Sequence, residues 1–84
     1  MRRMGVSEDI NWLKNDKEGV GKVFLIVADE GSVKLRELHR LFGEEDWWPL
    51  KSYLRALINR GLVADVVGNF DLTESGRKVL EGFK

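Results

Sequence analysis

Hydrophobic residues recur at helical spacing along most of the chain, which predicts a series of short helices. Ser7, Glu8 and Asp9 are typical of a helix start, because a hydroxyl can cap the first turn and acids favour the positive end of the helix dipole. A first helix is therefore expected over residues 7–15, as an N-terminal extension, with residues 1–6 frayed in front of it.

Two further helices are predicted before the middle of the chain. The first covers residues 16–28, starting at its first or second residue. Its buried stripe consists of Val20, Val23, Phe24 and Val27. The other covers residues 34–42 and ends at Gly43, since glycine readily adopts the left-handed conformation that closes many helices. Between the two helices, Val33 is expected to form a strand of one or two residues.

The helix predicted for residues 47–60 is the most informative part of the pattern, because its only charged residues are basic. On a helical wheel one arc is apolar and comprises Trp47, Leu50, Tyr53, Leu54, Leu57 and Ile58. The opposite arc comprises Trp48, Lys51, Ser52, Arg55 and Asn59. We expect the first arc in the core and the second in solvent. An exposed face with these donors suits a nucleic-acid groove, although an ordinary solvated helix face has a similar composition.

Alternation replaces helical spacing in residues 62–73, which predicts two strands of a hairpin. We expect a three-residue loop over 67–69, because that register pairs Val66 with Phe70 and keeps the apolar partners on one face. A last short helix is expected to start at Thr73. Its apolar residues are Val79, Leu80 and Phe83.

Composition narrows the classes of function. The 84 residues contain no cysteine, no apolar run of the roughly 20 residues that a membrane span needs, and no apolar stretch after the N-terminal arginines that would make a secretory signal. We therefore expect a cytoplasmic protein with no membrane association. The absence of glutamine and the many charged residues follow a trend of thermophilic proteins. His39 is the single histidine and is interpreted as a structural residue.

Nothing in the sequence indicates catalysis. It lacks a cysteine nucleophile, paired histidines and a glycine-rich phosphate loop, so we expect no enzyme, no metal or cofactor site and no small-molecule ligand. The net charge is zero, but residues 32–60 carry six basic and four acidic side chains, a local charge of +2. The middle of the chain is therefore the expected region for a partner that carries negative charge.

The ordered motifs resemble the winged helix-turn-helix superfamily, particularly small prokaryotic and archaeal transcriptional regulators. The matching segments are Leu35-Arg36-Glu37-Leu38, Gly43, Leu50-x3-Leu54-x2-Leu57-x3-Gly61-Leu62-Val63 and Phe70-x-Leu72-Thr73-x2-Gly76-Arg77-x2-Leu80. The resemblance implies one α+β, mostly α, domain over residues 1–84. Its winged-helix core would span 16–84, with a two-stranded hairpin wing and flanking N- and C-terminal helices.

The resemblance also implies a function and a set of contacts. In this family the helix that matches residues 47–60 lies in the major groove of double-stranded DNA. Contacts are then expected from its outer arc, and phosphate contacts from the preceding helix. The expected DNA-binding residues are Lys51, Ser52, Arg55, Trp48, Asn59, Arg36 and Arg40. Regulators of this family commonly act as homodimers, and Trp12 in the first helix is the expected anchor of the dimer unless that helix covers its own domain.

A second reading of the same motifs is a winged-helix module for protein–protein interaction that binds no DNA. Three features favour it: the neutral net charge, the acidic turn Glu44-Glu45-Asp46, and a hairpin that contains Asp65 and Asp71 but no Lys or Arg. A hairpin without basic side chains should contribute little to DNA affinity.

Overall fold

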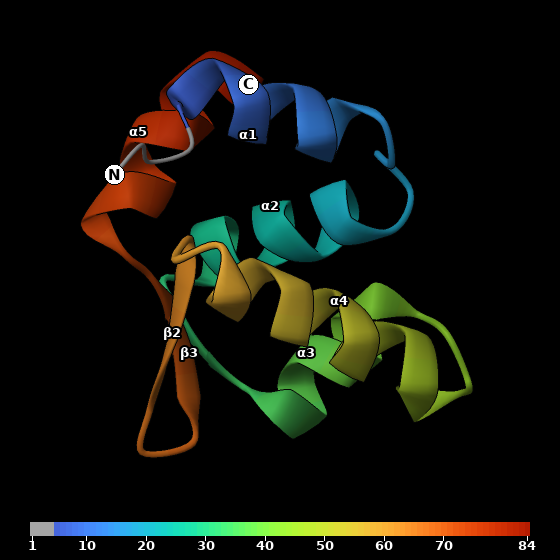
Figure 1. Ribbon diagram of the computed structural model, residues 1–84. Coiled ribbons are helices and arrows are strands. Elements are labelled where there is room, and N and C mark those ends of the chain that lie inside the picture. Colours follow the sequence, from blue (N-terminus) through green and yellow to red (C-terminus); the bar gives the residue numbers. More distant parts are fainter. Residues whose placement is uncertain (1–4) are drawn as a thin grey trace.

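The computed structural model describes residues 5–84, which form five helices and a three-stranded antiparallel sheet (Figure 1). The helices are α1 (Val6–Lys14), α2 (Val20–Glu30), α3 (Leu35–Phe42), α4 (Trp47–Asn59) and α5 (Glu74–Phe83), and the strands are β1 (Ser32–Lys34), β2 (Val63–Val66) and β3 (Asn69–Leu72). The coarse class expected from the sequence, α+β and mostly α, is confirmed. Over these residues, no helix is both long and apolar enough to cross a bilayer.

The first helix begins earlier than the sequence predicted. Gly5 is the N-cap residue of α1, and its N–H donates to Glu8 Oε1 at 2.9 Å. Ser7 therefore lies inside the first turn and does not cap it, because the reach of Glu8 back to Gly5 moves the helix start upstream. Fraying was expected for residues 1–6. Val6 is helical instead, and residues 1–4 lie outside the described part of the chain.

The second helix begins later than predicted, at Val20, although its stripe of four buried residues is confirmed. Residues 15–19 form turns in which the Asp16 carbonyl accepts from the N–H groups of Gly19 and Gly21. Gly19 is required there by close packing, since a Cβ on it would lie 2.6 Å from the Tyr53 ring. This contact brings the start of α2 against α4.

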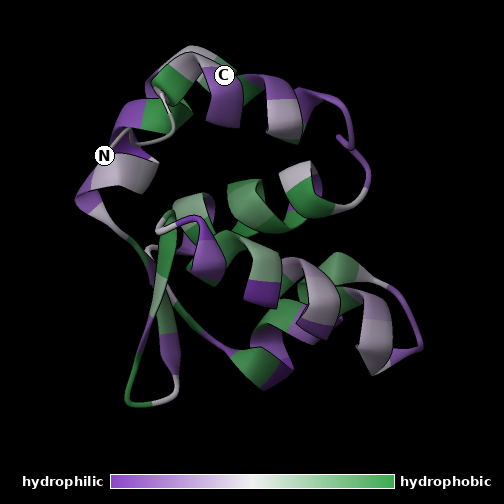
Figure 2. Ribbon diagram, in the orientation of Figure 1, coloured by the Kyte–Doolittle hydropathy of each residue, from purple (hydrophilic) through white to green (hydrophobic). Residues whose placement is uncertain are grey.

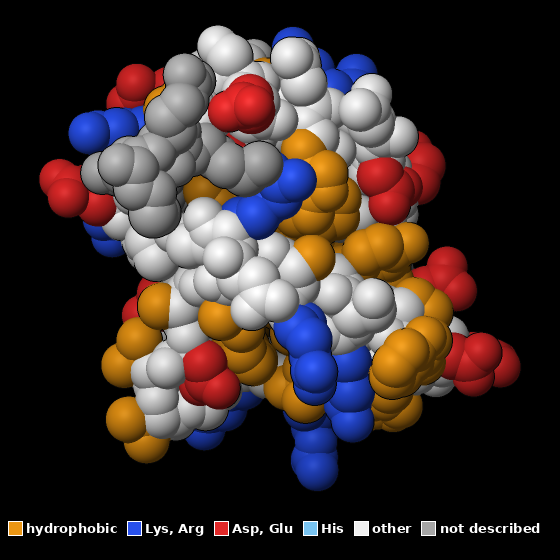
Figure 3. All heavy atoms as spheres, in the orientation of Figure 1, with side chains coloured by type: hydrophobic (Ala, Val, Ile, Leu, Met, Phe, Trp, Pro, Cys, Tyr) orange, Lys and Arg blue, Asp and Glu red, His pale blue; other side chains and the backbone are white. Residues whose placement is uncertain are grey.

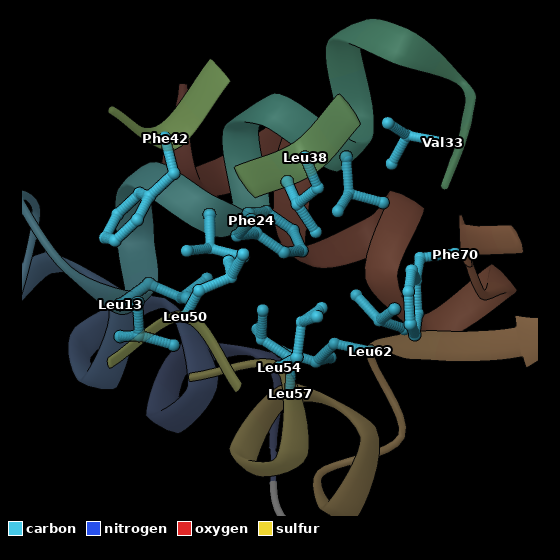
Figure 4. Packing of buried hydrophobic residues seen from close by; sticks show 14 of the residues in the cluster. Leu13, Phe24, Val33, Leu38, Phe42, Leu50, Leu54, Leu57, Leu62 and Phe70 are labelled. Carbon is cyan, nitrogen blue, oxygen red and sulfur yellow. The ribbon is translucent and has the colours of Figure 1, made fainter. Parts of the chain in front are cut away.

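The core lies between α2 in the centre of the molecule and the elements around it. Figure 2 shows apolar residues along most of α2, and Figure 4 shows Phe24 of this helix among side chains from α3, α4 and the hairpin. The fully buried residues include Phe24, Leu38, Leu50, Leu57 and Leu62. α3, α4 and the hairpin therefore each present one apolar face to α2 and leave the other face to solvent.

The hairpin has a different register from the predicted one. Val63 pairs with Leu72, Asp65 with Phe70 and Val66 with Asn69, so the loop is Val67-Gly68 rather than residues 67–69. Both loop residues have positive φ angles, 52° and 84°, as in the tight turns that match the twist of a hairpin.

The sheet contains a further strand that the sequence pattern left nearly unassigned. β1 has three residues and joins the sheet in the order β1-β3-β2, so the sheet has three strands instead of two. Val33 of β1 lies opposite Phe70. Because Val33, Phe70 and Val63 are all buried, the core face of the sheet is fixed by these residues, and Val66 is left in solvent.

The two end helices cover each other at the top of Figure 1. Leu13 and Val79 are fully buried there, and a Cβ on Gly82 of α5 would lie 2.3 Å from Ile10 Cδ1 of α1. The guanidinium of Arg60 stacks over the Trp12 ring at 4.0 Å and donates to Asp9 Oδ1 at 2.8 Å. Ile10, Trp12 and Leu13 of α1 are thus packed within the monomer while Val6 is exposed, and Trp12 is not an open anchor for a dimer.

Candidate functional site

The outer face of α4 carries the side chains that the sequence singled out. The helix begins at Trp47, as predicted, with Asp46 at the N-cap position although its carboxylate makes no capping hydrogen bond. Leu50, Leu54 and Leu57 are buried. All five residues of the opposite arc are exposed: Trp48, Lys51, Ser52, Arg55 and Asn59. The structure therefore brings these five together on one surface, which we call the α4 face.

Figure 3 shows how charge and apolar groups are distributed on this side of the molecule. Lys and Arg side chains gather at the centre of its lower half, and hydrophobic side chains flank them on both sides. Acidic side chains lie at the far right and also among the hydrophobic ones at the lower left. Trp48 is 76% exposed, which is unusual for the largest apolar side chain. An exposed aromatic ring beside cations can contact a base, a sugar or another protein.

The prediction that Trp47 belongs to the core is wrong. The side chain is 40% exposed, and its ring stacks on that of His39 at a centroid distance of 3.7 Å and an interplanar angle of 4°. Trp47 is in the first turn of α4, where its ring packs on His39 of α3 and the Lys51 ammonium lies over it. The wheel was wrong about Ile58 for a similar reason, because it lies near the other end of α4 and is also exposed.

A groove separates α4 from the hairpin. It has a volume of about 280 Å³ and is lined by Leu35, Lys51, Leu54, Arg55, Ile58, Asp65 and Phe70. Its apolar residues come from three elements, whereas the two cations both come from α4. Such a groove can accept an aromatic or aliphatic group of a ligand, while a negatively charged group of the same ligand lies near Lys51 and Arg55.

The groove was not predicted from the sequence. Lys51 and Arg55 were recognised because they share one helix with the other α4-face residues. Leu35 and Phe70 come from segments distant in the chain, and no periodicity connects them with α4. The sequence indicated only that Leu35 and Phe70 each lie on an apolar face, not that these faces meet α4.

The two predicted phosphate contacts on α3 are exposed but differ in their surroundings. Arg40 Nε donates to Glu37 Oε1 at 3.0 Å, and its Nη2 pairs with Glu37 Oε2. This hydrogen bond lowers the pKa of Glu37 and raises that of Arg40. Arg36 takes part in no ion pair within residues 5–84. A phosphate at Arg40 would therefore compete with Glu37, while Arg36 is open to one.

Acidic and apolar groups border the α4 face. Glu44, Glu45 and Asp46 are all exposed in the turn that leads into α4. In the hairpin, Asp65 Oδ1 accepts from the Gly68 N–H at 2.9 Å and thus supports the tight turn. The tip is apolar, with Val67 97% exposed. Neither border offers a cation to a phosphate.

Other kinds of site find no support in the described part of the chain. Among residues 5–84, no three side chains of the types His, Cys, Asp and Glu gather in a way that could hold a metal ion. No model of a known protein family matches the chain, and no curated protein and no solved structure matches it. Its function therefore has to be argued from the α4 face itself.

Proposed function

We propose that this protein is a winged helix-turn-helix transcriptional regulator that binds double-stranded DNA through α4. The observation that carries the proposal is the α4 face: one side of the helix is anchored in the core, and the other exposes hydrogen-bond donors without a single acid. With 13 residues, α4 is about 20 Å long. A helix of this length can lie in the major groove, which admits one α-helix.

Each predicted contact has a role in this proposal. Lys51 and Arg55 can donate to guanine O6 and N7, and a good bidentate contact discriminates by about 1–3 kcal/mol. Ser52 and Asn59 supply neutral donors and acceptors, and Trp48 stacks on a sugar or base. Arg36 and Arg40 on α3 bind phosphates and set the position of α4 without reading sequence.

The hairpin corresponds to the wing of this family and is assigned a minor role. It has no basic side chain, so it can approach DNA only through backbone N–H groups, Asn69 and its apolar tip. Two copies are proposed to pair on the DNA, where they read two half-sites as a homodimer. Because α1 packs on its own chain, the surface that joins such a dimer has to lie outside the buried side of α1.

A protein–protein interaction module without DNA binding is the second candidate function. The exposed ring of Trp48 beside an apolar groove favours it, since exposed tryptophans are frequent anchors of interfaces. The acidic turn before α4 favours it too, because Glu44, Glu45 and Asp46 repel a phosphate backbone.

A salt titration of duplex binding separates the two functions. We expect K51A/R55A to weaken binding. If both side chains contact phosphates, the slope of log K against log salt concentration flattens by about two, and if both contact base edges, affinity falls while the slope is kept. The matched control is K14A/K78A, which removes two exposed lysines from α1 and α5 and should leave the slope unchanged. Unchanged affinity of a folded K51A/R55A protein would rule out α4 as the DNA-binding element.

A further inference from the structure

We propose that a second copy of this chain docks on the α4 face, with the two α4 helices antiparallel about a two-fold axis. Each copy then covers the Lys51, Ser52 and Arg55 side chains of the other. The self-association is argued from the monomer surface alone. Its regulatory consequence, inhibition of DNA binding, rests on the proposed function.

Most charges of this surface lack an ion-pair partner inside the described part of the monomer, although Trp47 stacks on His39 and the Lys51 ammonium lies over the Trp47 ring. We call residues Glu44–Trp48 the acidic corner. Within residues 5–84, none of its three carboxylates forms an ion pair, and neither does Arg55. The Trp48 side chain is mostly in solvent, and the groove beside Arg55 is open. Charges of both signs and hydrophobic side chains thus lie on one side of the molecule (Figure 3), where Trp48 and the groove are both open to solvent.

The acids of this corner cannot neutralise Arg55 within one chain. Trp47 and Arg55 are eight residues apart, which corresponds to about 12 Å along the helix axis. The acids precede Trp47 and therefore cannot reach Arg55 of their own α4. An antiparallel second α4 removes that separation, because its acidic corner lies across from the middle of the first helix.

A two-fold axis near Leu50 gives the most favourable pairing. Residues at equal distances on either side of the axis then face each other across the two helices. Glu45 faces Arg55 of the second copy, and Trp48 faces Ser52, whose small side chain leaves room for the indole. From there the indole lies at the apolar groove, which is lined by Leu54, Ile58 and other residues. Each contact occurs twice, as an isologous interface requires.

The distribution of charge selects a second copy over other occupants. A nucleic acid or an acidic protein would use the cations of α4 and be repelled by the acidic corner. A basic partner would use the corner and be repelled by Lys51 and Arg55. A second copy of the same face can pair its acids with the cations of the first and its cations with the acids of the first. A chain with a net charge of zero has no overall repulsion against its own copy.

Charge-reversed variants test the interface directly by sedimentation equilibrium. The wild type should form a dimer at concentrations of a few hundred micromolar, as expected for a small interface. E44K/E45K and K51E/R55E should each raise the dimer dissociation constant by about tenfold or more, because each places like charges opposite each other. An equimolar mixture of the two variants should restore the dimer, since every charge pair is then opposite in sign.

Further outcomes decide against the proposal. A monomeric wild type at these concentrations would exclude the dimer, and a mixture that stays monomeric would exclude the pairing described here. If both variants dimerise like the wild type, the interface lies elsewhere. W48A should also weaken the dimer, and because Trp48 is so exposed its truncation should leave the fold intact, as a thermal melt can verify.

A competition experiment tests the regulatory consequence separately. E44K/E45K keeps the proposed DNA contacts and should bind a labelled duplex. K51E/R55E should not bind the duplex, but it should displace E44K/E45K from it by forming the mixed dimer. If the mixed dimer forms and the duplex stays bound, the dimer does not cover the DNA-binding face. If E44K/E45K binds no duplex at low salt, the proposed function fails while the dimer stands.

Discussion

The two ends of the molecule use their large side chains in opposite ways. Where α1 and α5 meet, Leu13 and Val79 are fully buried, and Trp12 lies under the guanidinium of Arg60. On the α4 face and at the hairpin tip, Trp48 and Val67 are turned outward. The first region, which we call the closed end, has little left to offer a partner. The second, which we call the open face, has unused apolar and charged groups.

This difference separates residues that stabilise the fold from residues that are available for binding. Burial of an apolar side chain contributes roughly 1.5–3 kcal/mol to stability, while an exposed one contributes little. Trp48 and Val67 therefore gain almost nothing for the monomer by being apolar. An exposed apolar side chain that does not stabilise the fold is therefore a better indicator of an interface than the fold itself is.

The largest difference in stability is expected between two truncations, one at the closed end and one on the open face. L13A should lower the free energy of unfolding by about 2–5 kcal/mol, because it leaves a cavity between α1 and the core. W48A should change it by less than about 0.5 kcal/mol, since the side chain is mostly in solvent. Urea denaturation measures both. Equal losses in the two variants would mean that Trp48 contributes to the core and that the open face is not open.

Much of the helical structure could be predicted because each helix carries its own signals. Gly43 ends α3 in the left-handed conformation, and Thr73 caps α5 by accepting the N–H of Gly76 at 2.9 Å. The two arcs of α4 also separate mainly as the wheel indicated. These features depend on residues within a few positions of one another, so a single sequence is sufficient to recognise them.

The features that could not be predicted depend on distant segments. The pairing of β1 with β3, with Val33 opposite Phe70, joins segments far apart in the chain, and for the hairpin itself an alternating pattern alone allows several registers. The exposure of Trp47 depends on how far α3 extends beside the first turn of α4. The candidate site divides in the same way: its donors share one helix, whereas the groove needs Leu35 and Phe70 from elsewhere.

An intermediate effect is expected from the ion pair of the closed end. Asp9 is buried and accepts from Arg60, which also stacks on Trp12, so the pair ties α1 to the C-terminal end of α4. D9N should lower the free energy of unfolding by about 1–3 kcal/mol, because the part-buried hydrogen bond loses the negative charge of its acceptor.

The matched control for D9N is E37Q, which removes the carboxylate of an exposed ion pair. That pair should contribute little to stability, since solvent screens it. Thermal melts of the two variants measure the difference. If D9N and E37Q are equally mild, α1 is held by its apolar contacts alone, and the closed end is less firmly closed than its geometry indicates.

The smallest effect has the opposite sign and concerns the hairpin tip. Val67 has a φ angle of 52°, a left-handed conformation that strains a β-branched side chain, and within residues 5–84 it is the one non-glycine residue with positive φ. Asn-Gly is the preferred sequence for such a turn. V67N should therefore raise the free energy of unfolding by about 0.5–1 kcal/mol.

The matched control is V66N, the same substitution at the preceding residue. It should lower the free energy of unfolding slightly, because Val66 is in a strand with ordinary φ and asparagine is a poor strand former. Opposite signs in urea denaturation would show that the open face contains strain as well as unused apolar surface, which the closed end does not. A loss of stability in V67N would instead show that Val67 packs favourably where it is, and its exposure would then say nothing about a partner.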